Sequence, residues 1–204
     1  MIISTFIAAA IGYVLGSLPF GYLVAKAKGV NIFEVGSKSP GATNVKRVLG
    51  AKAGNTVFAL DAMKGIIAAA TPLVFMLGGD PGTLGYELGG VAGVVGAVLG
   101  HSFSCFNGFR GGKGVATAAG GLFILMPIPC LWGAVAWVVT FYMFKYVSLA
   151  SIVSAVVISI APWAVGFSAV TSSVATVLGV LVIARHHANI RRLMAGREHR
   201  WDRK

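Results

Sequence analysis

The stretch best suited to chemistry is the run F-R-G-G-K-G-V-A-T over residues 109–117, where glycines and a lysine precede an apolar segment. Glycine lets the main chain approach a phosphate closely, and a helix that begins near Lys113 would add its dipole and its unpaired N–H groups. The run is not a P-loop, because Asn107 and Gly114 stand where a Walker sequence needs glycine and a hydroxyl residue. Taken alone, it fits a phosphate cradle and a tight connection between two helices equally well.

A second candidate anion site is the polar loop V-G-S-K-S-P-G-A-T-N-V-K-R over residues 35–47. Its hydroxyls, glycines and amide can surround a phosphate with donors, and the guanidinium of Arg47 can bind the same anion through two hydrogen bonds. A solvated loop of turn-forming residues that binds nothing also fits, and the loop taken alone favours that interpretation.

The third candidate is the pair His186 and Asn189, spaced as H-x-x-N at the start of a basic tail. One helical turn apart, the imidazole and the amide face the same side and can contact hydroxyl or phosphate oxygens. A polar anchor at a membrane interface fits this spacing equally well.

Three further polar residues lie in or beside apolar segments. Asp61 and Lys64 are one turn apart, and their i, i+3 spacing favours a structural ion pair over a catalytic carboxylate. His101 closes an apolar segment just before the glycine run, and a polar anchor at the interface is the favoured interpretation there.

The elements that position these residues must lie in a bilayer. The 204 residues are 56% hydrophobic and 11% charged, whereas soluble domains are about 25% charged. A net charge of +11 would suggest a nucleic-acid partner for a soluble protein. A membrane protein instead concentrates Lys and Arg on its cytoplasmic side, so no nucleic-acid partner is predicted.

Apolar stretches predict an all-α integral membrane protein with seven transmembrane helices in a single domain, residues 1–204. Prolines 127 and 129 are expected to form a turn between two of the helices. The expected spans are residues 2–25, 56–77, 86–103, 115–126, 131–144, 147–165 and 168–184.

The basic residues predict the orientation of these spans. All 17 fall within residues 26–64, at 110 and 113, at 145, or within residues 185–204, and the expected outer connections contain none. The positive-inside rule then places the N-terminus outside and the C-terminus in the cytoplasm. Ile190, Leu193, Met194 and Trp201 in the basic tail predict an interfacial helix on the anionic leaflet.

Missing patterns narrow the chemistry. None of the histidines is followed by the H-x-x-x-x-D arrangement of many glycerolipid acyltransferases, and no D-x-x-D cluster could hold magnesium. The sequence therefore predicts neither a metal nor a cofactor. Cys105 and Cys130 are expected on opposite membrane faces, too far apart for a disulfide.

Three polar motifs follow one another along the chain: G-S-x-x-x-G-A-T-N-x-x-R at 36–47, H-x-F at 101–103 with the glycine run, and H-x-x-N-I-x-R-L-x-x-G-x-E at 186–198. With G-S-x-P at 16–19 and L-D-x-x-K-G at 60–65 they cover the chain end to end. This pattern resembles the bacterial membrane acyl-phosphate:glycerol-3-phosphate acyltransferases, the PlsY family. The resemblance implies seven helices in the bacterial cytoplasmic (inner) membrane, with an active site that faces the cytoplasm. It also implies acyl transfer from acyl phosphate to the first hydroxyl of glycerol 3-phosphate, giving lysophosphatidic acid and phosphate in phospholipid synthesis.

The resemblance also implies site residues. The catalytic set would be Lys113, Arg47 and His186, and the substrate-binding set Ser37, Asn189, Gly111 and Gly112. Thr43 and Asn44 are expected only to shape the first loop. The chain departs from the family pattern at Lys38 and Ser39 (usually Gly and Asn), Ser104 (commonly Pro) and Arg110 (Lys).

The expected partners are acyl phosphate, glycerol 3-phosphate and membrane lipids. His186 is the one nearby group of suitable pKa for a base, but the donor's own phosphate can take the proton instead, and the missing H-x-x-x-x-D favours that substrate-assisted route. Two alternatives stay open. One is a small transporter of a phosphorylated solute, and the other is an acyltransferase that uses acyl thioesters.

Overall fold

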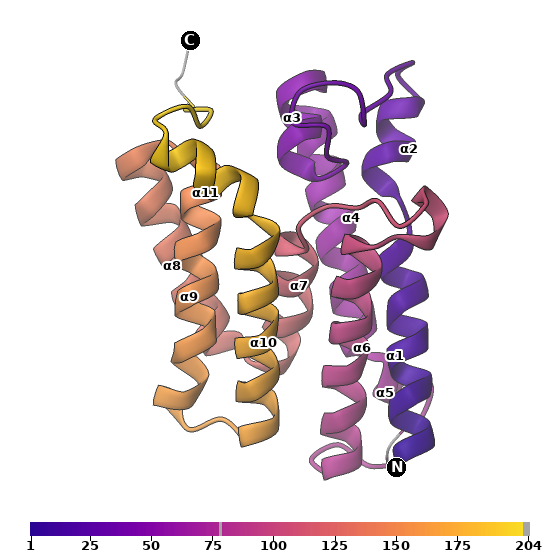
Figure 1. The fold of residues 1–204 in the computed structure, drawn as a ribbon. Coiled ribbons are helices and arrows are strands. Elements are labelled where there is room, and N and C mark those ends of the chain that lie inside the picture. The colour runs from indigo at the N-terminus through magenta and orange to yellow at the C-terminus, as the bar shows by residue number, and fades with distance from the viewer. Residues whose placement is uncertain (78, 202–204) are drawn as a thin grey trace. The chain divides into compact units, whose positions relative to one another are not determined.

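The computed structural model describes residues 1–77 and 79–201, and within that part every regular element is a helix (Figure 1). Four of these helices, or five if the bent pair α10–α11 is one span, are long and apolar enough to cross a membrane. The all-helical prediction is therefore confirmed for the described residues. The last three residues of the basic tail, 202–204, lie outside them. The chain divides into two compact units, Met1–Leu125 and Met126–Lys204, each of which is described by itself.

In unit one, α1 packs along α6, α4 packs along α7, and α6 contacts both α4 and α7. This arrangement leaves the short helices α2 and α3 and the turn η1 at the end of the unit opposite the N-terminus (Figure 1). The elements are α1 (Ile2–Ser17), α2 (Phe20–Lys26), α3 (Ala42–Leu49), α4 (Ala51–Ala69), α5 (Thr71–Val74), α6 (Leu84–Ser102), η1 (Cys105–Asn107) and α7 (Val115–Leu125).

The expected first span is confirmed as Ile2–Lys26, with an interruption of the helix at Leu18 and Pro19, between α1 and α2. Proline has no N–H to continue the helical ladder, and the residue before it is driven out of the helical region. The carbonyl of Leu18 accepts from the backbone N–H of Phe20 at 3.1 Å and from Nζ of Lys64 at 3.3 Å. A polar group released by the break is therefore capped by a lysine from α4.

Glycines let α1 and α6 touch backbone to backbone. A Cβ built on Gly16 would overlap the carbonyl oxygen of Ala97, and one on Gly96 would overlap that of Ala9. Such small-residue seams are how membrane helices gain packing energy without a hydrophobic driving force. The seam fixes α6, whose last turn carries His101.

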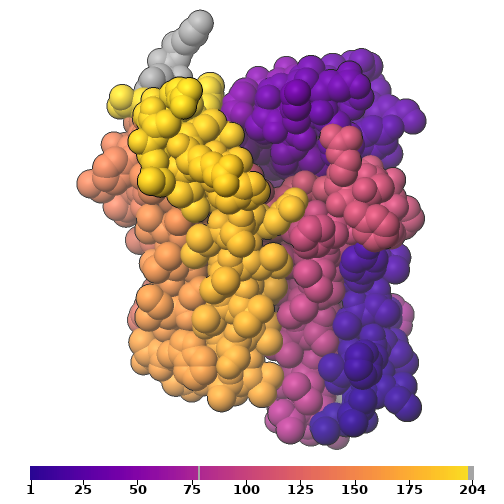
Figure 2. Space-filling model, in the orientation of Figure 1, coloured from indigo at the N-terminus to yellow at the C-terminus, as the bar shows by residue number. Residues whose placement is uncertain are grey.

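In unit two, α9 packs against both α8 and α10. Helix α10 bends by 57° into α11, which lies across one end of α9 and α10 (Figure 2). The elements are α8 (Pro127–Phe144), α9 (Val147–Val165), α10 (Ala169–Arg185) and α11 (His187–Met194).

Large apolar side chains stay on the surface of both units. Phe6 in unit one is 72% exposed, and Val135 and Ile160 in unit two are 62% and 61% exposed. Apolar surface on this scale needs a covering. Bilayer lipid provides one for a chain with several helices of spanning length.

Several boundaries differ from the prediction. The expected span 56–77 is divided into α4, which begins earlier at Ala51 and ends at Ala69, and the short helix α5. Helix α8 begins at Pro127, so the expected proline turn is wrong: both prolines lie in the first turn of a helix, where the missing N–H is harmless. Trp201 is not part of the tail helix, which ends at Met194. Instead, the N–H of Trp201 donates to the carbonyl of Lys145 at 2.7 Å.

The glycine seam generates the first prediction. Gly96→Ala should lower the unfolding temperature of the detergent-solubilised protein, because the added methyl forces α1 and α6 apart at a cost of about 1–3 kcal/mol. Ala10→Val on the exposed face of α1 is the matched control and should leave that temperature unchanged. Equal unfolding temperatures for Gly96→Ala and wild type would contradict the seam.

Candidate functional site

Asn44 organises the first polar loop. Its side chain is 2% exposed and makes three hydrogen bonds. Oδ1 accepts the N–H of Ser37 at 2.8 Å, and Nδ2 donates to the carbonyls of Val35 and Ser39 at 3.1 and 2.9 Å. The expected shaping role of Asn44 is confirmed. Its consequence is that Ser37 is held by its backbone while the residue itself stays exposed.

Lys38, one of the departures from the family pattern, adopts a left-handed backbone with φ +57°. Glycine reaches this region freely, whereas other residues pay roughly 1–2 kcal/mol. The turn is therefore preserved although the usual glycine is absent. The loop keeps its path because Asn44 ties both sides of the turn.

Arg47 lies in the last turn of α3 and is half-buried. Helix α3 packs against α4, and Val45 belongs to a buried cluster with Ile32 and Val57. The core below the loop therefore fixes the helix that carries the guanidinium.

The glycine run forms the connection from η1 to α7. Gly108 and Phe109 both have φ +60°, and the N–H of Phe109 donates to the carbonyl of Ser104 at 2.8 Å. Helix α7 begins at Val115, two residues after Lys113, as the sequence predicted. The first N–H groups of a helix have no partners within it, so Lys113 lies beside a helix end of positive potential.

The glycines at 111 and 112 lie directly on His101. The N–H of Gly112 donates to the carbonyl of His101 at 3.1 Å. A Cβ at Gly111 would overlap that carbonyl, and a Cβ at Gly112 would overlap Nε2 of the imidazole. The backbone of His101 and Ser102 leaves no room for a side chain at Gly111, and a side chain at Gly112 would have to displace the imidazole. The N–H of Gly112 is engaged inside the protein.

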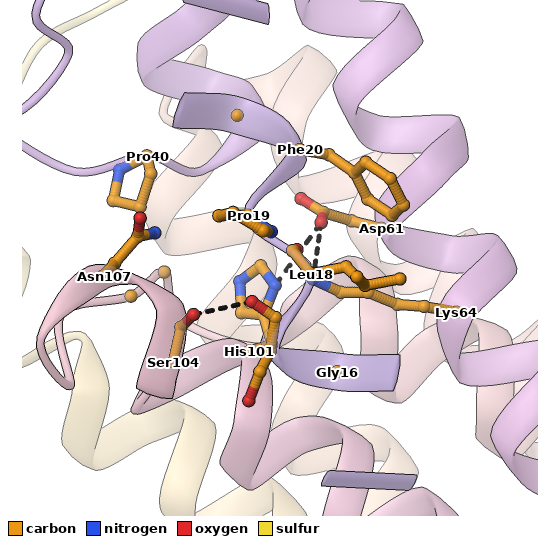
Figure 3. Close-up of a pocket in the computed structure, with 14 residues that line it drawn as sticks. Gly16, Leu18, Pro19, Phe20, Pro40, Asp61, Lys64, His101, Ser104 and Asn107 are labelled. Carbon is orange, nitrogen blue, oxygen red and sulfur yellow. Dashed lines mark hydrogen bonds and ion pairs between the residues drawn. The ribbon is translucent and has the colours of Figure 1, made fainter. Parts of the chain in front are cut away.

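Both loops meet at one pocket of unit one (Figure 3). The guanidinium of Arg110 also stacks over the ring of Phe33, 4.3 Å from its centroid, and joins the glycine run to the segment just before the first loop. The pocket is lined by residues 16–21 around the α1–α2 break and by Pro40, Asp61, Lys64, His101, Ser104, Asn107, Gly111 and Gly112.

A buried polar cluster lies in this pocket. Lys64 Nζ is 2.8 Å from Asp61 Oδ1, and each side chain is 4% exposed, so the predicted ion pair is confirmed. His101 is also buried, with Nδ1 3.5 Å from the same oxygen. Its interpretation as an interfacial anchor is therefore wrong. The sequence did contain a signal for a buried histidine. His101 lies shortly before the glycine run, and the chain also carries a carboxylate, Asp61, within an apolar helix.

In unit two, His186 caps the start of α11 and is 2% exposed. Its Nδ1 lies 2.7 Å from the carbonyl of Val182, so Nδ1 carries the hydrogen and donates it. A neutral imidazole held in this way has its lone pair on Nε2.

Asn189, one turn further, is held by Glu198. Its Nδ2 donates to Oε1 of Glu198 at 2.7 Å, and that carboxylate also accepts from Ser148 at 3.0 Å and from Nε of Arg192 at 2.6 Å. Burial alone would raise the pKa of Glu198. The hydrogen bonds from Asn189, Arg192 and Ser148, together with the charge of Arg192, outweigh it and hold the pKa below its usual value.

Comparison with known proteins identifies this arrangement. The family model for glycerol-3-phosphate acyltransferase matches residues 6–196. The chain belongs to the glycerol-3-phosphate acyltransferase family. The relative from Aquifex aeolicus (strain VF5) is 44% identical, with 93% of this chain and 95% of the relative covered. The relative from Hydrogenobaculum sp. (strain Y04AAS1) is 41% identical, with 96% of each chain covered.

Solved structures agree. The glycerol 3-phosphate form of PlsY, an integral membrane glycerol 3-phosphate acyltransferase, matches with a TM-score of 0.86 and 40% identity, over 98% of this chain and 96% of that one. Its lysophosphatidic acid form matches with a TM-score of 0.83 at the same identity, over 97% and 95%. The chain is therefore an integral membrane acyltransferase of phospholipid synthesis.

In this acyltransferase the predicted site residues fall into two groups. Ser37, Arg47, Gly111, Gly112 and Lys113 lie on the two loops of unit one that meet at the pocket and on the helix after the first loop. The remaining two, His186 and Asn189, lie at the α10–α11 bend of unit two.

The Glu198 contacts generate a pH prediction. A lowered pKa in the folded state stabilises the fold above the unfolded glutamate pKa of about 4.3, and this stabilisation is lost as the pH falls through the lowered value. Glu198→Gln should therefore lower the unfolding temperature at neutral pH, with a loss of about 1.5–3 kcal/mol for a hydrogen bond to a charged group.

The same substitution should make little difference in acid below that window. Glu34→Gln, which changes an exposed carboxylate, is the matched control. The measurement is the unfolding temperature in detergent against pH. A destabilisation by Glu198→Gln that is equally large at both ends of the range would contradict this role.

Proposed function

We propose that the protein transfers a fatty acyl group from acyl phosphate to the sn-1 hydroxyl of glycerol 3-phosphate, giving lysophosphatidic acid and phosphate. The observation that carries the proposal is the likeness to PlsY in its glycerol 3-phosphate and lysophosphatidic acid forms, which covers almost the whole chain. These two ligands are the acceptor and the product of such a reaction. The acyl phosphate donor is supported by the motif pattern.

The chemistry suits a site built from positive charge. The acceptor hydroxyl attacks the acyl carbonyl carbon, and the bond from that carbon to the phosphate oxygen breaks. Phosphate leaves with the electron pair, so the protein mainly has to neutralise two phosphates and align the hydroxyl. Lys113 beside the N-terminus of α7 and Arg47 at the end of α3 supply that charge.

The proton of the attacking hydroxyl has two routes. Nε2 of His186 can accept it, because Nδ1 donates to the carbonyl of Val182. The phosphate of the donor can accept it instead, and we favour this substrate-assisted route. In that route His186 positions the substrate rather than taking its proton.

The substrate-binding groups in this proposal are Ser37, Asn189, Gly111 and Gly112. In this proposal both units supply site residues: His186 and Asn189 belong to unit two, and the others belong to unit one. This agrees with the sequence, in which both units carry polar motifs.

For the topology we propose seven transmembrane helices in one domain, with the N-terminus outside and the C-terminus and active site on the cytoplasmic side of the bacterial inner membrane. The distribution of basic residues supports this arrangement. Helix α4 fits as a span because the two charges in its interior, Asp61 and Lys64, are paired and buried, and its third charge, Lys52, lies in the first turn. Helix α7 has only 11 residues, which suits a helix that starts inside the site.

The test is production of lysophosphatidic acid by purified protein given palmitoyl phosphate and glycerol 3-phosphate, with and without EDTA. Product in both conditions is expected. Product only with palmitoyl thioester would overturn the donor assignment, and loss of activity in EDTA would contradict a metal-free reaction. Uptake of glycerol 3-phosphate into liposomes without any acyl transfer would replace the enzyme by a transporter.

Lys113→Ala and Arg47→Ala should each lower kcat/KM by about 10²-fold or more, because each removes a charge that stabilises the developing phosphate. Both variants should keep the wild-type unfolding temperature. Lys52→Ala, which removes an exposed lysine from α4, is the control and should be fully active. A wild-type kcat/KM in either site variant would show that the substituted residue has no role in the site.

His186→Ala separates the two proton routes. Removing a general base costs about 10²-fold or more. The substrate-assisted route predicts a smaller fall in kcat, about tenfold or less on that same scale. Single-turnover measurement of acyl transfer decides between them, since it reports the chemical step without product release.

A further inference from the structure

The cluster Asp61, Lys64 and His101 has no role in the proposed reaction. Its members come from two helices, α4 and α6, and converge in the pocket (Figure 3), whose lining also includes Gly111 and Gly112. All three side chains are at most 9% exposed. Burying a charged pair costs desolvation energy, and apolar residues of similar size often stabilise a core as well or better. Stability by itself is therefore a weak reason for this cluster.

Asp61 is held in one place from both sides. Lys64 Nζ lies 2.8 Å from its Oδ1, and the same ammonium donates to the carbonyl of Leu18 at the α1–α2 break. Asp61 Oδ1 in turn faces Nδ1 of His101 at 3.5 Å. A carboxylate fixed in this way sets the orientation of the imidazole ring and favours a hydrogen on Nδ1.

His101 supports both glycines of the run. Its carbonyl accepts the N–H of Gly112, and the Cα of Gly111 rests on the same carbonyl. The Cα of Gly112 rests on the imidazole at Nε2. Because Lys113 follows directly, a rotation of the imidazole would move the backbone from which that lysine projects.

We propose that Asp61 and His101 are positioning residues for the glycine run: Asp61 fixes the imidazole of His101, and that ring and its carbonyl set the conformation of residues 111–113 for phosphate binding. This inference rests on the proposed role of Lys113 and its glycines. Misplacement of a binding group by about 1 Å can cost 10²-fold in rate. A small change of the ring can therefore have a large kinetic effect.

The first experiment compares two double variants, Asp61→Asn/Lys64→Met and Asp61→Ala/Lys64→Met. Both remove the ion pair without leaving a buried unpaired charge. Only the first keeps an oxygen that can accept from His101. The expected result is a near wild-type KM for the phosphate substrates in the Asn variant and a rise of about tenfold or more in the Ala variant, in line with the cost of misplacement.

The second experiment measures coupling between His101 and Gly112. Gly112→Ala places a methyl against the imidazole and should impair the enzyme strongly. His101→Ala removes the ring and makes room for that methyl. The double variant should therefore be less impaired than the product of the two single effects. This comparison decides the question if the Asp61 variants do not fold.

A merely structural role of Asp61 and His101 predicts different results in both experiments. A structural role would lower the yield of folded protein while KM and kcat of the folded fraction stayed unchanged, and the effects of the Gly112 and His101 variants would multiply. His199→Asn, at an exposed histidine, is the control for histidine substitution in general. Wild-type KM in Asp61→Ala/Lys64→Met together with independent Gly112 and His101 effects would overturn the inference.

Lys113→Ala tells the two proposals apart. If Lys113→Ala has wild-type kinetics, the proposed phosphate site itself is wrong. If Lys113→Ala is impaired while the Asp61 and His101 variants behave as wild type, the site stands and the positioning role is wrong.

Discussion

Backbone polar groups that leave a helix in an apolar medium must find partners inside the protein. In unit one this constraint is met where the helices end. The carbonyl of Ser17 accepts from Ser104 at 2.6 Å, that of Leu18 from Lys64, and that of His101 from Gly112. The first two of these bonds join segments far apart in the sequence, and the third ties the glycine run to the end of α6. The requirement to satisfy the backbone therefore also assembles the pocket below the glycine run.

In the proposed reaction acyl phosphate brings its own leaving group, so the protein would have little covalent chemistry to perform. Its main task would be to hold positive charges in fixed positions. In each polar segment, another residue of the protein fixes the conformation. Asn44 ties the first loop through three hydrogen bonds, His101 underlies the glycine run, and Glu198 holds Asn189. Residues of both loops and Asn189, which are expected to contact substrate, are thus held by other groups of the protein.

The features that could be predicted from the sequence are those that depend on residues close together in the chain. Helix α9 spans the expected residues, α7 starts next to Lys113, and Asp61 pairs with Lys64, because hydropathy and i, i+3 spacing are local properties. Contacts between distant segments carry no such pattern. The hydrogen bond from Gly112 to the carbonyl of His101 and the one from Trp201 to the carbonyl of Lys145 could not be predicted from residue spacing. The start of α8 was missed because prolines mark both turns and first helical turns.

The glycine seam between α1 and α6 also bears on the lipid substrate. At Gly16 and Gly96 the backbones of the two helices are in direct contact, so no gap is left between them there. A hydrocarbon tail cannot slide between helices that touch in this way. This side of unit one is therefore closed to lipid, and an acyl chain on its way to the site must pass along some other pair of helices.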